Sequence, residues 1–122
     1  MVDFIAVWAI SSTGATDAVA QKDIGNKRPL NTLENSEEVR DFYDDWNLDN
    51  KHNKDMLGWN YTGPKETVDS LKRFAPDTNM LIFDAACGSG LVGAELTAAG
   101  YRSLHGADLS EKLLDRVPAG LY

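Results

Sequence analysis

Three glycines and an acidic residue in the second half of the chain have the types and spacing of a nucleotide site. Gly88, Gly90 and Gly93 spell G-x-G-x-x-G where an apolar run gives way to a helical pattern. Glycines at such a turn let a ligand lie directly against the backbone, and the following helix offers free N–H groups. Asp108 follows Gly90 by about 18 residues, where the neighbouring strand of such a fold ends. A carboxylate there can bond both hydroxyls of a ribose, so we predict a site for an adenosine-containing ligand.

A second acid, Asp84, bears on which ligand of this kind fits. It ends the apolar run shortly before Gly88, where a dinucleotide site must accommodate a pyrophosphate. A carboxylate there would repel phosphates at short range, whereas it suits a ligand that carries positive charge. The methionine half of S-adenosylmethionine carries an ammonium and a sulfonium group. We therefore favour S-adenosylmethionine and keep an NAD(P)-binding oxidoreductase as the alternative.

Apolar periodicity predicts two helices upstream of the glycines. The first covers about 36–46 and begins with a capping-box-like start at Asn35. The second begins at Gly63-Pro64, because proline suits the first helical turn, and ends at Pro76. The polar segment 47–60 between them is typical of a loop.

From Pro76 onward, the pattern alternates between strands and helices. An apolar strand over Met80–Phe83 is followed by a helix over Leu91–Ala99, a second strand over Arg102–Ala107 and a short helix capped by Ser110. This order predicts an α/β fold with parallel strands. Both predicted strands end in an acid, which brings the two carboxylates to one edge of the sheet.

Composition limits the class of protein. The chain has 122 residues, a net charge of −7 and a single cysteine, Cys87. The negative charge does not favour a nucleic-acid partner, and one cysteine excludes an internal disulfide and fits a reducing compartment. No apolar run approaches the length of a membrane span. We therefore expect a cytoplasmic protein without a membrane partner, and no nucleic-acid partner is indicated.

Residues 1–35 are predicted to be a flexible leader. Its apolar start, Phe4–Ile10, is consistent with an irregular segment or a loosely attached strand. The small residues Ala18-Val19-Ala20 loosely imitate the cleavage box of a secretory signal, but Asp3 stands where a signal needs positive charge. The folded part is therefore expected to begin at residue 36.

Two segments carry a resemblance to a known family. Leu81–Gly93 resembles the first motif of class I S-adenosylmethionine-dependent methyltransferases, and His105–Ser110 resembles the segment after it. The chain is most similar to the methyltransferase-like family of the Williams–Beuren region. Members of that family share a Tyr-Asp-x-Trp helix, a Tyr-x-x-Pro and a Gly-Leu-Tyr, which stand here at Tyr43–Trp46, Tyr61–Pro64 and Gly120–Tyr122.

The resemblance implies a partial, Rossmann-like methyltransferase domain over 36–122 and a role for each motif residue. Asp84 would face the methionine moiety, Asp108 the ribose and Leu109 the adenine, while Tyr43 and Trp46 would come from a helix that closes over the site. The implied cofactor-binding set is Asp84, Ala86, Cys87, Gly88, Ser89, Gly90, Asp108, Leu109 and Tyr43. The aromatic pair also fits the buried stripe of a packed helix, and the acids of that helix fit a solvated face.

The resemblance also shows what this sequence lacks. Asn50-Lys51 stands where the family has a second Tyr-Asp pair. The strands that would supply the acceptor groove lie beyond Tyr122, so neither a catalytic residue nor the methyl acceptor is predicted. Met80–Phe83 would lack a strand partner on one side, and its open edge suggests self-association. A non-catalytic interaction module is therefore a further alternative.

Overall fold

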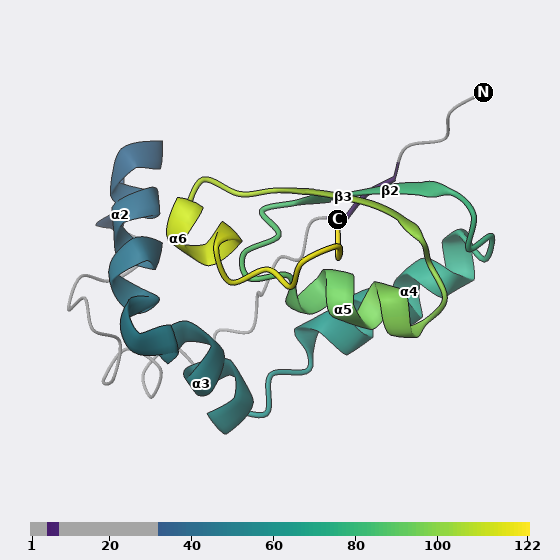
Figure 1. Cartoon of the computed structure of the whole chain (residues 1–122), viewed down its shortest axis with the longest axis horizontal. Coiled ribbons are helices and arrows are strands. Elements are labelled where there is room, and N and C mark those ends of the chain that lie inside the picture. Colours follow the sequence, from purple (N-terminus) through teal and green to yellow (C-terminus); the bar gives the residue numbers. More distant parts are fainter. Residues whose placement is uncertain (1–4, 8–31) are drawn as a thin grey trace.

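The computed structural model describes residues 5–7 and 32–122 of the chain. Figure 1 shows how its helices and strands are arranged. In chain order they are strand β1 (Ile5–Val7), helix α2 (Ser36–Trp46), the 3-10 turn η2 (Leu48–Asn50), helices α3 (Lys51–Gly58) and α4 (Gly63–Phe74), strand β2 (Leu81–Ala85), helix α5 (Leu91–Ala98), strand β3 (Ser103–Ala107) and helix α6 (Glu111–Leu114).

The described strands form a small parallel sheet in the order β1-β2-β3. Ile82 in β2 pairs with Ile5 on one side and with Leu104 on the other. Helices and parallel strands combined in this way are compatible with the predicted α/β class. The two acids predicted to share one edge do so, since Asp84 lies near the end of β2 and Asp108 follows β3 directly.

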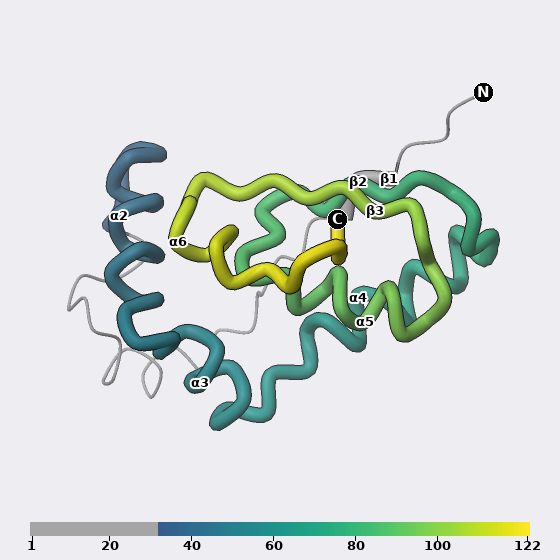
Figure 2. The backbone as a smooth tube through the Cα atoms, viewed as in Figure 1, coloured from purple at the N-terminus to yellow at the C-terminus, as the bar shows by residue number. Residues whose placement is uncertain are grey.

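The sequence predicts an open edge on the Met80–Phe83 strand, and this prediction is wrong. Strand β1 pairs along that edge. The pairing joins segments that are far apart in the chain, so no local pattern reveals it. Figure 2 follows the backbone of β2 and of its other neighbour, β3. Residues 1–4 and 8–31 of the predicted leader, with the Ala18-Val19-Ala20 box, lie outside the described residues.

The first helix agrees with its prediction, but the loop after it does not. Asn35 caps α2, because its side-chain Oδ1 accepts from the Glu38 N–H at 2.9 Å. The predicted loop over 47–60 instead contains η2 and α3. Polar contacts hold α3 in place: Asp55 pairs with Lys51 one turn earlier and accepts from the Trp46 indole N–H at 2.8 Å. Helix α3 thus depends on tertiary contacts rather than on an apolar stripe.

The main core lies between the sheet and helices α4 and α5. It contains Val68, Leu71, Ala75, Ile82, Leu96, Tyr101 and Leu104. The buried Tyr101 phenol donates to the Ala75 carbonyl at 2.7 Å, which ties the end of α4 to the segment before β3. On the opposite face of β3, Ser103, His105 and Ala107 are exposed, as the alternation of side chains along a strand requires.

A smaller core joins α2 to its surroundings. Phe42 and Trp46 are buried there, with Leu33, Tyr43 and Met56 packed against them. Helix α2 also contacts α6. Since α6 begins shortly after Asp108, this contact brings α2 close to the end of β3. Among the described residues, no helix combines the length and apolar content that crossing a bilayer requires.

Candidate functional site

The loop between β2 and α5 has an unusual backbone. Ala86, Gly88 and Gly90 all have positive φ, at 60°, 54° and 86°. Of these three, Ala86 alone has a side chain, and such a conformation is uncommon for a non-glycine residue. The loop is tied to the neighbouring strand because the Cys87 N–H donates to the Ala107 carbonyl at 3.0 Å. The geometry is therefore a fixed, tight turn at the carboxyl edge of the sheet.

Asp108 is held against this turn through both of its carboxylate oxygens. Oδ2 accepts from the Gly88 N–H at 2.8 Å, and Oδ1 accepts from the Ser110 N–H at 2.9 Å. The side chain therefore has a defined orientation, and each oxygen retains a second lone pair. The structure thus brings together Gly88 and Asp108, the pair that the spacing singled out.

Asp84 has a different environment beneath the loop. The residue is 3% exposed, and its Oδ2 accepts from the Tyr122 phenol O–H at 2.6 Å. Burial raises the pKa of Asp84, and the negative charge of Asp108 raises it further, while the Tyr122 hydrogen bond acts in the opposite direction. Asp84 is thus a carboxyl group enclosed by the protein, with its charge facing that of Asp108.

The glycines of the motif do not all face the same surroundings. A Cβ on Gly93 would lie 2.4 Å from the Tyr122 hydroxyl, and a Cβ on Gly90 would lie 2.7 Å from Leu121. At Gly88 the nearest atom to such a Cβ is a Leu113 methyl at 3.9 Å. Gly90 and Gly93 therefore make room for the chain's own last two residues, a role that the sequence analysis did not assign. The least crowded of the three is Gly88, beside Asp108.

The remaining loop residues, Cys87 and Ser89, are both buried. Burial, together with the charges of Asp84 and Asp108, raises the pKa of the Cys87 thiol to about 11. Cys87 is therefore protonated near neutral pH and is not an activated nucleophile. The Ser89 hydroxyl donates to Asn53 Oδ1 at 2.6 Å, which connects the loop to helix α3.

The upstream aromatic residues lie close to the Asp108 side of the site. The rings of Tyr43 and Trp46 stack with centroids 5.9 Å apart. Burial raises the pKa of Tyr43, and the charge of Asp108 adds to this effect, so the phenol lies within electrostatic reach of that carboxylate. Trp46 is 5% exposed and belongs to the small core. The ring of His52 in α3 packs edge-on against that of Trp46, with centroids 4.8 Å apart. The sequence predicts a loop here and gives no indication of this contact.

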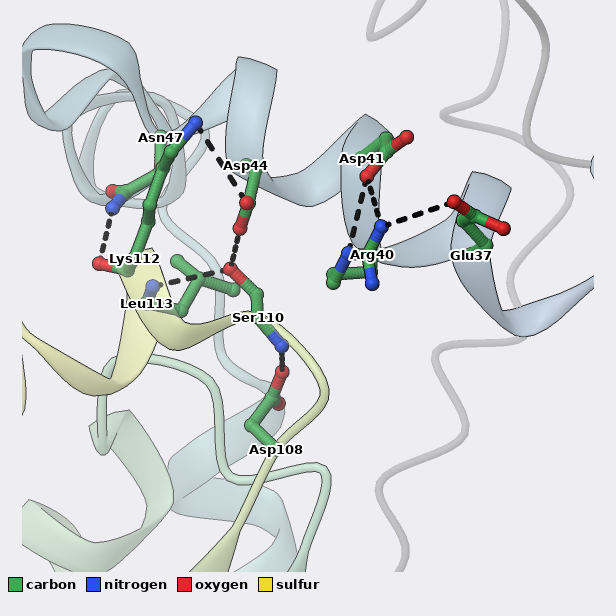
Figure 3. A network of polar contacts seen from close by, with 9 residues as sticks. All are labelled: Glu37, Arg40, Asp41, Asp44, Asn47, Asp108, Ser110, Lys112 and Leu113. Atoms are coloured by element: carbon green, nitrogen blue, oxygen red, sulfur yellow. Dashed lines mark hydrogen bonds and ion pairs between the residues drawn. The ribbon is translucent and has the colours of Figure 1, made fainter.

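A polar seam between α2 and α6, shown in Figure 3, was also missed by the sequence analysis. Asp44 accepts from the Ser110 hydroxyl and pairs with the Lys112 ammonium at 3.7 Å. Asn47 donates through Nδ2 to the Lys112 carbonyl at 2.8 Å. Asp44 was interpreted as part of a solvated helix face, but its side chain is 17% exposed. Ser110 does cap α6, as predicted, by accepting from the Leu113 N–H at 3.1 Å.

The surface near Asp108 offers an apolar side chain. Leu109 follows Asp108 directly and is 58% exposed, so it is available to a ligand held by that carboxylate. Two hollows of about 520 and 350 Å³ lie elsewhere, on either side of Leu48 and Asp49. Neither is lined by the glycine loop or by Asp108, and their mixed acidic and basic linings do not suggest a ligand class.

Comparison with known proteins gives one informative similarity. No protein-family model matches the chain, and no solved structure matches it significantly. The human protein named methyltransferase-like protein 27 is 43% identical to this chain over 84 residues. The match covers 66% of this chain and 34% of the relative, so the chain spans about a third of the length of that protein. The similarity confirms the resemblance predicted from the motifs and relates this chain to the methyltransferase-like proteins.

Proposed function

We propose that this chain is the cofactor-binding part of an S-adenosylmethionine-dependent methyltransferase of the cytoplasm, and that loop 86–90 and Asp108 hold the cofactor. The observation that supports this most is the hydrogen bond between Gly88 and Asp108 at 2.8 Å. It puts an oriented carboxylate beside Gly88, the motif glycine with the least crowded Cα. The name of the human relative agrees with this class of enzyme.

The residues present fit the chemistry of S-adenosylmethionine. Asp108 keeps free lone pairs for the two ribose hydroxyls, and the exposed Leu109 offers apolar surface to the adenine ring. Tyr43 of helix α2 lies within electrostatic reach of Asp108. Asp84 places a second negative charge beneath the loop, toward the cationic methionine half. When bound, this cofactor supplies a methyl group on a sulfonium, which a nucleophile on the acceptor can attack.

The same two acids argue against the dinucleotide alternative. Burial raises the pKa of Asp84, and the charge of Asp108 raises it further, so negative charge is unfavourable at this edge. A pyrophosphate would add two more negative charges to this edge. A ligand with a net positive methionine moiety relieves the repulsion instead. We therefore favour the methyl donor over NAD(P).

Calorimetric titration of the intact chain with S-adenosylhomocysteine and, separately, with NAD tests the proposal. We expect heat of binding with S-adenosylhomocysteine and none with NAD. Asp108→Ala should abolish that heat, whereas Asp45→Ala, which removes an exposed acid of α2, should leave it unchanged. Binding of NAD without binding of S-adenosylhomocysteine would overturn the assignment in favour of an oxidoreductase.

A further inference from the structure

The Tyr122 side chain enters a slot between helix α5 and strand β3. Its ring approaches Gly93 of α5 and Gly106 of β3, where an added Cβ would lie 2.4 Å from the phenol oxygen and 2.9 Å from a ring carbon. At the end of the slot, the phenol O–H donates to Asp84 at 2.6 Å. The ring thus reaches the loop from below, on the covered side of the sheet.

The chain accommodates this ring at some cost. A glycine inside a strand removes a packing side chain, and a glycine inside a helix lowers helix stability by about 1 kcal/mol relative to alanine. Gly106 lies within β3 and Gly93 within α5, and both are in contact range of the same ring. Gly106 is outside the G-x-G-x-x-G motif, so the cofactor pattern does not account for it. Space for Tyr122 accounts for Gly93, and space for Tyr122 together with the Cys87 thiol, which would lie 2.9 Å from the added Cβ, accounts for Gly106.

The hydrogen bond from Tyr122 gives the buried Asp84 carboxylate a donor in place of water. The titratable groups that face Asp84 are Cys87 from the loop, Asp108 from the end of β3 and Tyr122 from the tail. Asp108 opposes ionisation of Asp84, whereas the phenol donates to the carboxylate and favours its charged form. Burial and Asp84 itself raise the pKa of Tyr122, so the phenol keeps its proton and stays a donor throughout the physiological range.

We propose that Tyr122 is a positioning residue that fixes the Asp84 carboxylate, in its charged form, beneath the glycine loop for the cationic half of the cofactor. This inference rests on the proposed function and adds a residue to it. Tyr122 does not touch the cofactor in this scheme and acts only through Asp84. Its ring fills the slot between α5 and β3, and its hydroxyl orients the acid.

The test compares Tyr122→Phe with Tyr101→Phe in the intact chain. Both variants keep the ring and lose one hydrogen bond, but the Tyr101 phenol bonds the Ala75 carbonyl in the main core. We expect Tyr122→Phe to weaken S-adenosylhomocysteine binding about tenfold near pH 7 and to move the pH below which binding is lost upward. Tyr101→Phe should lower the melting temperature and leave both affinity and pH profile unchanged.

A second readout separates this inference from the proposed function. NMR titration of the Asp84 carboxyl carbon reports its ionisation without any ligand. We expect Tyr122→Phe to raise the midpoint of that titration and Tyr101→Phe to leave it in place. If the wild-type chain does not bind S-adenosylhomocysteine, the proposed function fails, and the Asp84 midpoint still tests the role of Tyr122. An unchanged midpoint and pH profile in Tyr122→Phe would overturn the inference.

Discussion

Asp84 and Asp108 lie at the carboxyl ends of neighbouring parallel strands, yet the protein treats the two acids differently. Asp108 is half-buried and accepts two backbone N–H groups, from Gly88 and Ser110. Asp84 is buried and accepts from a single phenol, that of Tyr122. The first acid therefore holds the loop together, whereas the second is a charge that the fold must accommodate. Asp84 lies inside β2, opposite Gly106, whereas Asp108 follows the end of β3. Two acids at one edge of the sheet thus have different energetic roles.

The largest effect is expected when Asp108 is changed to Asn. An amide has one oxygen, so its NH₂ group must face either the Gly88 or the Ser110 N–H, and that donor loses its partner. An unsatisfied buried donor costs about 1–3 kcal/mol. Since these two donors are partly buried, the free energy of unfolding should fall by up to that amount in urea titrations. Binding of S-adenosylhomocysteine should be lost in the same variant. Full stability in Asp108→Asn would show that the two backbone contacts do not hold the loop.

Gly93→Ala tests how the protein accommodates Tyr122, the residue that donates to Asp84. The new Cβ would lie 2.4 Å from the Tyr122 hydroxyl, and overpacking of this kind costs about 1–3 kcal/mol. In a Tyr122→Ala background the clash disappears, and the alanine should then stabilise α5 by up to about 1 kcal/mol, as expected inside a helix. Denaturant unfolding of the four chains gives the coupling between the two sites. A destabilisation of equal size in both backgrounds would show that Tyr122 does not fill the slot.

Asp84→Asn should change the free energy of unfolding in the opposite direction from Asp108→Asn. The folded-state pKa of Asp84 is raised, chiefly by burial, so its contribution to stability is present at acid pH and is lost as pH rises through the folded value. The amide oxygen can still accept from Tyr122, and the buried charge is gone. We expect this variant to be more stable than the wild type near pH 7, with the difference vanishing toward pH 3, and to lose S-adenosylhomocysteine binding.

Urea titrations at several pH values check this sign. A stability difference that stays constant from pH 3 to pH 7 would mean that Asp84 is not a buried charge in the folded chain. Loss of stability in both Asp84→Asn and Asp108→Asn would remove the distinction between the two acids. Binding lost together with increased stability would instead mark Asp84 as a residue kept for its function.

The sequence predicts the Asp108 half of the site better than the Asp84 half. The spacing of Gly88 and Asp108 is a local property of a strand, turn and helix unit, and the structure brings the two residues together. The contact between Asp84 and Tyr122 joins residues 38 positions apart, and nothing in the motif indicates it. The glycine pattern predicts a tight turn against which a ligand can lie, but it does not predict that Gly90 and Gly93 accommodate Leu121 and Tyr122.

The same division applies to the fold. Helix α2 was predictable because its apolar stripe and the Asn35 cap are local. Helix α3 was not, because it is held by Asp55 bonding to Trp46 of another helix. The pairing of β1 with β2 was not predictable either, since Ile5–Val7 and Leu81–Ala85 are far apart in the chain. Local patterns thus predict single elements, and long-range contacts decide which of them meet.

Cys87 provides the finest test, because its thiol lies near both acids. The pKa of Cys87 is raised to about 11 by burial first, then by Asp84 and then by Asp108. We expect Asp84→Asn to lower the pKa of Cys87 and Asp108→Asn to lower it less, since a neutral amide no longer opposes thiolate formation. Ultraviolet absorbance of the thiolate during an alkaline titration measures both shifts, with Asp45→Ala as the control that leaves Cys87 unaffected. A larger shift in Asp108→Asn than in Asp84→Asn would reverse the assignment of the buried charge, because it would make Asp108 the acid whose field dominates beneath the loop.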